Sequence, residues 1–141
     1  MRGIIGKMVQ GIRLPTIPGG FGVSDLTIHT FQEIQIMEMV NVVAVITAKP
    51  GQRAALLEMF NANVPAVHAE DGCIEYAATT DTPDVGPFQT EFGEDTFVVI
   101  EKWESLAALM AHAVAPHMKD YAARSKDMIA DRVIHVLSPT N

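Results

Sequence analysis

The segment 96–103 (TFVVIEKW) limits the possible folds more than any other part of the chain. Alternation along a strand places Phe97 and Val99 on one face and Val98 on the other, so both faces are apolar. A strand of this kind is covered on both faces, and helices usually supply one of the covers. We therefore expect a strand inside a sheet that has helices on one face and a second layer on the other.

The remaining elements follow from hydrophobic periodicity and turn residues. Residues 40–48 (VNVVAVITA) are rich in β-branched side chains and end at a Lys-Pro-Gly turn. Residues 88–92 could extend along a strand before Gly93. The expected elements, in chain order, are a strand at 40–48, a helix at 52–68, strands at 73–80 and 96–103, a helix at 105–113, a second helical piece from 116 to about 128, and a strand at 132–137.

This order, βαββαβ, is typical of a ferredoxin-like α+β fold. In that fold a four-stranded antiparallel sheet carries helices on one face only. The other face would stay uncovered in a chain that is 48% hydrophobic. We expect a second sheet to bury it, most simply in a homodimer with two-fold symmetry.

The chain divides into two parts of different composition. Residues 1–38 mix Gly, Pro and Ile without a sustained period, and we interpret them as an N-terminal extension, an arm or a poorly ordered segment. Phe31, Ile34 and Ile36 could form a short strand or pack on a partner. In this part three cations balance three acids, so the whole net charge of −7 lies in residues 39–141. We expect those residues to form the one folded domain.

Composition excludes several classes of partner. A net charge of −7 argues against binding to nucleic acid or to an anionic membrane, both of which require clustered Lys and Arg. The single cysteine, Cys73, excludes an internal disulfide framework and suits a reducing compartment. No run approaches the ~20 apolar residues of a membrane-spanning helix. We predict a cytoplasmic protein.

The region after the segment 96–103 contains side chains suited to small-molecule chemistry. Trp103 ends the strand, and His112 lies on the helix that follows. His117 and Tyr121 lie one helical turn apart, beyond a break at Pro116. The two histidines can converge only if the break folds the helical pieces toward each other. Because an imidazole is a natural base near neutral pH, this pattern predicts a pocket with a histidine base.

Each of these side chains also has a structural interpretation. A histidine can satisfy carbonyl groups at a helix end, and Trp103 can simply pack in the core. Asn41 and Glu101 are polar residues on otherwise apolar strands, and buried polar groups need partners. Glu101 shares a strand face with Trp103, and both would face an interior cavity if that face is the one without helices. A buried carboxylate there could hold a histidine in one tautomer.

No motif for a metal or a nucleotide is present in the sequence. His112 and His117 are spaced i, i+5 across a proline, unlike the i, i+4 pair of a helical zinc site, and no third ligand is adjacent. The Gly-rich stretch at 18–22 precedes no helical pattern, so it is not a phosphate-binding or dinucleotide-binding loop. We therefore predict no metal site.

Residues 39–141 resemble the antibiotic-biosynthesis monooxygenase family, most closely its quinol monooxygenases, in the order and spacing of several short motifs. The resemblance covers about three-quarters of the chain and does not reach residues 1–38. The motifs are KPGQ at 49–52, VP at 64–65, EDGC at 70–73, Tyr76, FQ at 88–89, IEKWES at 100–105, AH at 111–112, PHMK at 116–119 and Tyr121.

The resemblance implies a dimeric α+β barrel that oxidises a quinol or related polyphenol with O₂ and needs no flavin, haem or metal. It implies that His117 or His112 is the catalytic base and that Trp103 forms an aromatic wall. Asn41 and Tyr76 would orient the substrate, and Glu101 and Tyr121 would also line its site. A quinone reductase is a possible partner that would supply the quinol.

Two other functions fit the same fold. The His…Pro-His pair also resembles a relative that isomerises a phosphorylated sugar, but such a substrate needs cations, and residues 39–141 have only seven Lys and Arg. A non-catalytic small-molecule-binding stress protein would present a similar pocket. Asn41, Trp103 and His117 superficially match the set of haem-degrading relatives. That histidine lies in a Pro-His-Met segment shared by non-haem members, so we do not expect haem.

Overall fold

The computed structural model describes residues 30, 32 and 38–140 of the chain. The predicted arm at Phe31, Ile34 and Ile36 lies outside these residues. The described elements are β1 (Val40–Ala48), α2 (Arg53–His68), β2 (Cys73–Thr79), β3 (Thr96–Trp103), α3 (Leu106–Ala113), α4 (Pro116–Ser125), a 3-10 helix (Lys126–Met128) and β4 (Ile129–Leu137).

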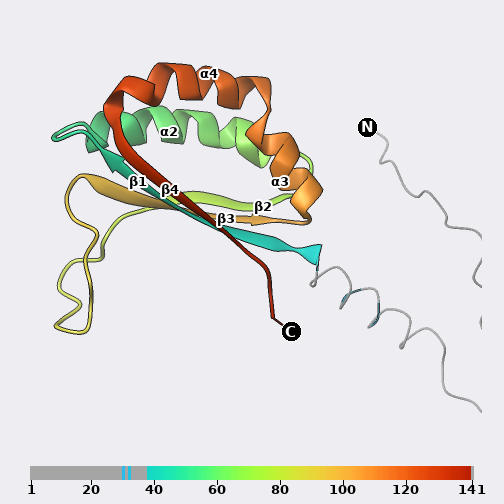
Figure 1. Ribbon diagram of the computed structural model, residues 1–141, viewed down its shortest axis with the longest axis horizontal. Coiled ribbons are helices and arrows are strands. Elements are labelled where there is room, and N and C mark those ends of the chain that lie inside the picture. Colours follow the sequence, from blue (N-terminus) through green and yellow to red (C-terminus); the bar gives the residue numbers. More distant parts are fainter. Residues whose placement is uncertain (1–29, 31, 33–37, 141) are drawn as a thin grey trace, which may run out of the picture.

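The strands form one antiparallel sheet in the order β2-β3-β1-β4. β1 lies between β3 and β4 and pairs with both, while β2 pairs with β3 at one edge. The helices α2, α3 and α4 cover one face of this sheet (Figure 1). The arrangement confirms the ferredoxin-like α+β fold that the order of elements predicts.

Burial along β1 shows which side chains face the helices. Val42 and Ala44 are buried beneath the helical layer, whereas the alternating Val43 and Val45 are only half-buried. The core gathers around this buried row. Its members are Val40, Val42, Ala44, Ile46, Ala48, Leu56, Phe60, Val67, Tyr76, Phe97, Val99 and Trp103.

The faces of β3 correct one expectation from the sequence. Trp103 lies opposite Val40 of β1, and Glu101 lies opposite Val42, so both point toward the helices. Glu101 and Trp103 therefore do not lie on the face of the sheet that lacks helices, which was the arrangement considered from the sequence. The reason is that both strand faces of β3 are apolar, so alternation alone could not decide which one the helices cover.

The ends of several elements differ from those expected. β2 ends at Thr79, and β4 begins at Ile129, where a register shift lets Ala48 pair with Ile129. Residues 88–92 form no strand. Instead the Asp81 carboxylate accepts hydrogen bonds from the backbone N–H groups of Phe92 and Gly93, at 3.0 and 2.9 Å. These bonds hold a long β2–β3 connection that projects away from the helical layer (Figure 1).

Candidate active site

A cavity of about 640 Å³ lies between the helical layer and the sheet. β1, β3 and β4 form its floor, and α2, α3 and α4 contribute to its walls. Most of its lining is apolar, which suits an aromatic or aliphatic ligand. The polar and aromatic side chains that line it are Phe60, Tyr76, Glu101, His112, Tyr121, Ser125, Lys126 and Arg132.

His112 lies near the end of α3, a helix of only eight residues with a capped N-terminus, and so reaches the cavity. The Ser105 hydroxyl accepts a hydrogen bond from the backbone N–H of Ala108 at 3.1 Å, which caps the first turn. Two turns later His112 is 5% exposed. Its ring lies 4.7 Å from the Trp103 ring and 5.4 Å from that of Tyr76. The imidazole is thus fixed between two aromatic rings at the cavity wall.

Glu70 fixes the hydrogen bonding of His112. The Nδ1 atom of His112 lies 3.1 Å from both carboxylate oxygens of Glu70, which follows α2. A carboxylate only accepts hydrogen bonds, so we assign the proton to Nδ1. In the neutral ring the free lone pair is then on Nε2, the atom available to take a proton from a ligand.

Glu70 also contacts the second histidine. Nε2 of His117 lies 2.6 Å from Oε1 of Glu70, an ion-pair distance when the imidazole is protonated. The angle is not that of a hydrogen bond, and His117 Nδ1 is buried with no partner among the described residues. The break at Pro116 therefore does bring the two histidines together, through a shared carboxylate. His117 itself does not line the cavity.

Glu101 and Trp103 form a second buried polar pair. The indole N–H of Trp103 donates to Oε2 of Glu101 at 2.8 Å. Burial raises the pKa of the Glu101 carboxyl, and the bond from Trp103 and the nearby His112 oppose that rise. Glu101 lines the cavity, whereas the fully buried Trp103 lies behind His112 and supports its ring. The predicted aromatic wall is thus supplied by other rings.

Two tyrosines and one phenylalanine provide those rings. Tyr76 stacks on Phe60 at 5.1 Å, and Tyr121 meets the edge of Phe60 at 6.2 Å. Burial raises the pKa of both phenols, so they stay protonated and can donate hydrogen bonds to a ligand. Both line the cavity, where the sequence placed them as candidate substrate-binding residues.

Asn41 lies apart from this cavity. It pairs with Lys102 of β3 and Leu137 of β4, on the face of the sheet without helices. The structure therefore brings together Tyr76, Glu101, His112 and Tyr121 as cavity lining, with Trp103 and His117 behind them and Asn41 on the opposite face.

Three contributors were not identified from the sequence. Glu70 belongs to the EDGC motif, but nothing in its spacing shows that it meets two histidines more than 40 residues away. Lys126 and Arg132 come from either side of the α4–β4 junction and line the cavity together. Only the folded chain brings Glu70 to the two histidines and the two cations to the cavity.

Across the described range, no group of three or more His, Cys, Asp and Glu side chains is placed to hold a metal ion. None of the described helices combines the length and the apolar character needed to cross a membrane.

The chain belongs to the antibiotic biosynthesis monooxygenase family, whose sequence pattern matches residues 39–124. It is 41% identical over 103 residues to the Escherichia coli protein named "Probable quinol monooxygenase YgiN", covering 72% of this chain and 98% of that protein. A crystal structure from Pseudomonas aeruginosa superposes with a TM-score of 0.62 at 26% identity, covering 75% of this chain and 98% of that one. A Mycobacterium tuberculosis structure gives 0.60 at 26% identity, covering 73% and 96%.

Proposed function

We propose that this protein oxidises a quinol or a related polyphenol with O₂. The observation that carries the proposal is the pairing of His112 with Glu70 at the wall of a largely apolar cavity. The name of the Escherichia coli relative, "Probable quinol monooxygenase YgiN", supports the substrate class. The cavity volume of about 640 Å³ suits a ligand with one or two aromatic rings.

His112 would start the reaction by taking a phenolic proton on Nε2. The Glu70 carboxylate, on the other side of the ring, stabilises the imidazolium that forms. The resulting phenolate is electron-rich enough to reduce O₂ without flavin, haem or metal. One oxygen atom enters the ring as a hydroxyl, the other leaves as water, and the quinol ends as a hydroxylated quinone. Tyr76 and Tyr121 would donate hydrogen bonds that orient the ring oxygens.

Oxygen uptake by metal-free protein with freshly reduced quinols tests the proposal, with boiled protein as the control for autoxidation. We expect enzyme-dependent uptake of one O₂ per quinol and a product that is heavier by one oxygen than the quinone. Binding of the quinone, seen as a raised melting temperature, without any enzyme-dependent uptake would instead indicate a non-catalytic binding protein.

An isomerase of a phosphorylated sugar is a second candidate, favoured by one observation. Lys126 and Arg132 both line the cavity, so cations are available there despite the small number of Lys and Arg. The surroundings of His112 favour the aromatic substrate, because its ring lies against the rings of Trp103 and Tyr76 at the wall of a largely apolar cavity.

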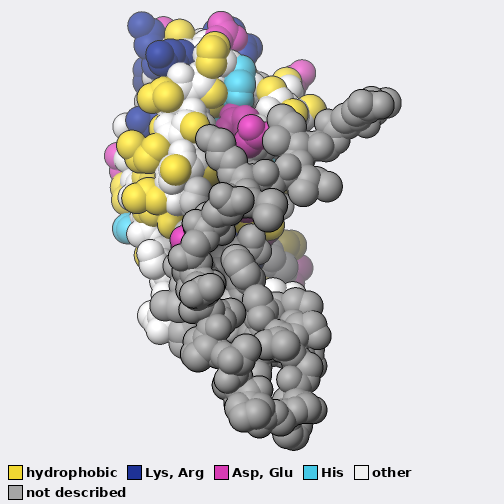
Figure 2. Space-filling view, turned by 90° about the vertical axis from the view of Figure 1, so that its right-hand side faces the viewer, with side chains coloured by type: hydrophobic (Ala, Val, Ile, Leu, Met, Phe, Trp, Pro, Cys, Tyr) yellow, Lys and Arg dark blue, Asp and Glu magenta, His cyan; other side chains and the backbone are white. Residues whose placement is uncertain are grey.

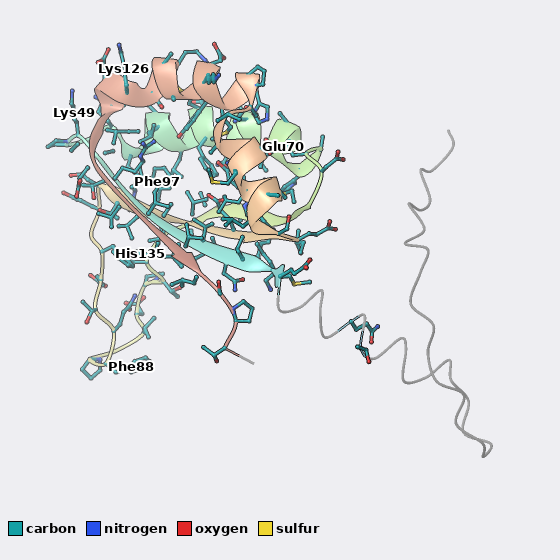
Figure 3. All side chains as sticks on the ribbon, turned by 45° about the vertical axis from the view of Figure 1, so that its right-hand side comes forward. Lys49, Glu70, Phe88, Phe97, Lys126 and His135 are labelled. Carbon is teal, nitrogen blue, oxygen red and sulfur yellow. The ribbon has the colours of Figure 1, made fainter. Side chains whose placement is uncertain are left out.

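We further propose that two copies pack through the faces of their sheets that lack helices and so form the dimeric barrel. Val133 and Leu137 are 42% and 49% exposed on that face. Phe88, 84% exposed at the tip of the β2–β3 connection, projects from the same side (Figure 3). Burial of these side chains would supply the hydrophobic driving force.

The mass in solution tests this dimer. Light scattering of the eluted protein should give twice the chain mass of 15.3 kDa. Val133→Lys should shift the mass toward that of one chain, and Val114→Lys, at an exposed site on the helical side, should not. A monomeric wild-type protein would contradict the dimer.

We also propose a domain division and a cellular location for the protein. Residues 39–141 form the catalytic domain and residues 1–38 an extension, and the family match beginning at residue 39 supports this division. We place the protein in the cytoplasm, where a quinone reductase can supply the reduced substrate.

A further inference from the structure

The cavity has a charged end that the proposed oxidation does not use. Lys126 and Arg132 line it, on the 3-10 helix and on β4. Neither side chain forms an ion pair or a hydrogen bond with any described residue. On the face seen in Figure 2, Lys and Arg side chains gather at the α4 end of the molecule, next to hydrophobic side chains.

The acidic neighbours of these cations are engaged or lie outside the cavity lining. The Asp131 carboxylate accepts a hydrogen bond from the backbone N–H of Arg132 at 2.9 Å, and Asp120 pairs with Arg124. Asp127 is adjacent to Lys126 in the chain but does not line the cavity. The Arg132 charge also acts on the Tyr121 phenol, whose pKa it lowers against the larger effect of burial.

This charged end lies far from the His112–Glu70 pair. Arg132 is opposite Ile46 on β1, which is opposite Phe97 on β3, and Glu101 is four residues further along β3. With ordinary strand spacings, the Cα atoms of Arg132 and Glu101 are about 17 Å apart. Figure 3 shows Lys126 and Glu70 at opposite ends of the helical layer.

We propose that Lys126 and Arg132 form an anion-binding subsite, and that the substrate is a fused-ring hydroquinone with a carboxylate on a side chain. The inference rests on the proposed oxidation for the aromatic half of this substrate. The ring lies among Phe60, Tyr76 and Tyr121 with a hydroxyl at His112, and the carboxylate pairs with Arg132 in a bidentate contact. Both cations line the same cavity and are exposed to solvent, so each is free to pair with the carboxylate of a bound ligand.

Binding of a matched pair of ligands tests the subsite without depending on turnover. The probes are 3-(1,4-naphthoquinon-2-yl)propanoate and its neutral methyl ester, titrated by calorimetry into the full chain. We expect the acid to bind about tenfold more tightly than the ester, and added salt to reduce that preference. Equal affinities, or tighter binding of the ester, would overturn the subsite.

Variants then assign the preference to these side chains. Arg132→Gln and, separately, Lys126→Gln should each reduce the preference for the acid while leaving the affinity for the ester unchanged. Lys119→Gln removes the same charge from an exposed position on α4 outside the cavity lining, and should leave the preference intact. Melting temperatures of all three variants show whether they fold. An unchanged preference in folded Arg132→Gln and Lys126→Gln would overturn the assignment.

Two further measurements separate this inference from the proposed oxidation. Oxygen uptake with the reduced ester tests the oxidation alone, because the ester does not need the subsite. Ribose 5-phosphate tests whether the cations serve a phosphorylated sugar, and binding tighter than that of the carboxylated quinone would overturn the aromatic substrate class. We expect oxidation of both hydroquinones, with a lower KM for the acid, and no binding of the sugar phosphate.

Discussion

The imidazole of His112 and the carboxylate of Glu70 face each other with Nδ1 3.1 Å from both carboxylate oxygens. Such a contact fixes the ring orientation and the tautomer and places a negative charge beside any imidazolium that forms. Glu70 is only 15% exposed, so water screens this interaction weakly. The pair is therefore arranged to let His112 accept a proton on the atom that remains free.

Loss of the Glu70 charge should slow the oxidation. Glu70→Gln keeps the size and one acceptor oxygen but no longer stabilises the imidazolium, and we expect kcat to fall about 100-fold. Oxygen uptake with a reduced naphthoquinone measures it. Glu75→Gln, an exposed carboxylate on β2, is the matched control and should keep full activity. An unchanged kcat in Glu70→Gln would show that the negative charge of Glu70 does not contribute to the reaction.

The two histidines should differ in importance. His112 lines the cavity and His117 does not, so His112→Ala should lower kcat by about 100-fold or more and His117→Ala by less than about tenfold. The same oxygen assay separates them, provided that circular dichroism shows both variants folded. If His117→Ala lowers kcat more than His112→Ala does, the base is His117, and the substrate does not bind in the cavity as proposed.

The sequence predicted the fold well because its signals are local. The β-branched run at 40–48, the doubly apolar strand at 96–103 and the helical spacing between them each specify an element, and their order leaves few topologies. The helix-covered face of β3 could not be predicted, since both faces are apolar. It depends on how Val40 and Val42 of β1 pack under the helices.

The candidate site was predicted less completely. His112, Glu101 and Tyr121 could be selected because polar or aromatic side chains stand out among apolar neighbours, whereas Tyr76 followed only from the resemblance to the family. Asn41 stands out for the same reason, yet strand alternation places it on the other face of the sheet. The Glu70 contact depends on the path of the chain after α2, which no periodicity encodes.

The buried Glu101 carboxyl predicts a specific dependence of stability on pH. Burial raises its pKa above the ordinary value, against the opposing effects of Trp103 and His112. Between the two values the folded protein binds more protons than the unfolded chain, so this group lowers the unfolding free energy as pH rises through that window. Glu101→Gln should therefore gain stability relative to wild type as pH rises, while its side-chain oxygen can still accept from the indole of Trp103.

Urea unfolding of both proteins at about pH 4 and about pH 7 measures this effect. The difference between Glu101→Gln and wild type should be more favourable to the variant at the higher pH. Glu75→Gln, which is exposed, should show no such trend. A difference for Glu101→Gln that does not change with pH would contradict the raised pKa.

Gly72 holds α3 close to the start of β2 and thereby sets the distance between Glu70 and His112. Its φ is +82°, and an added Cβ would lie 2.6 Å from the Cβ of Ala108 on α3. Its carbonyl also accepts a hydrogen bond from the backbone N–H of Glu104 at 2.8 Å, just before that helix. A methyl group at this position must push α3 away from the strand.

Gly72→Ala should lower the unfolding free energy by about 3 kcal/mol, from backbone strain plus overpacking. Gly51→Ala is the matched control, because its φ of +77° is similar and no atom lies within 4 Å of the added Cβ. It should cost only about 1 kcal/mol and leave kcat unchanged. Since Gly72→Ala also shifts His112 relative to Glu70, its kcat should fall even at temperatures where the variant is fully folded. Equal stability losses in the two variants would show that α3 yields to the added methyl group without strain.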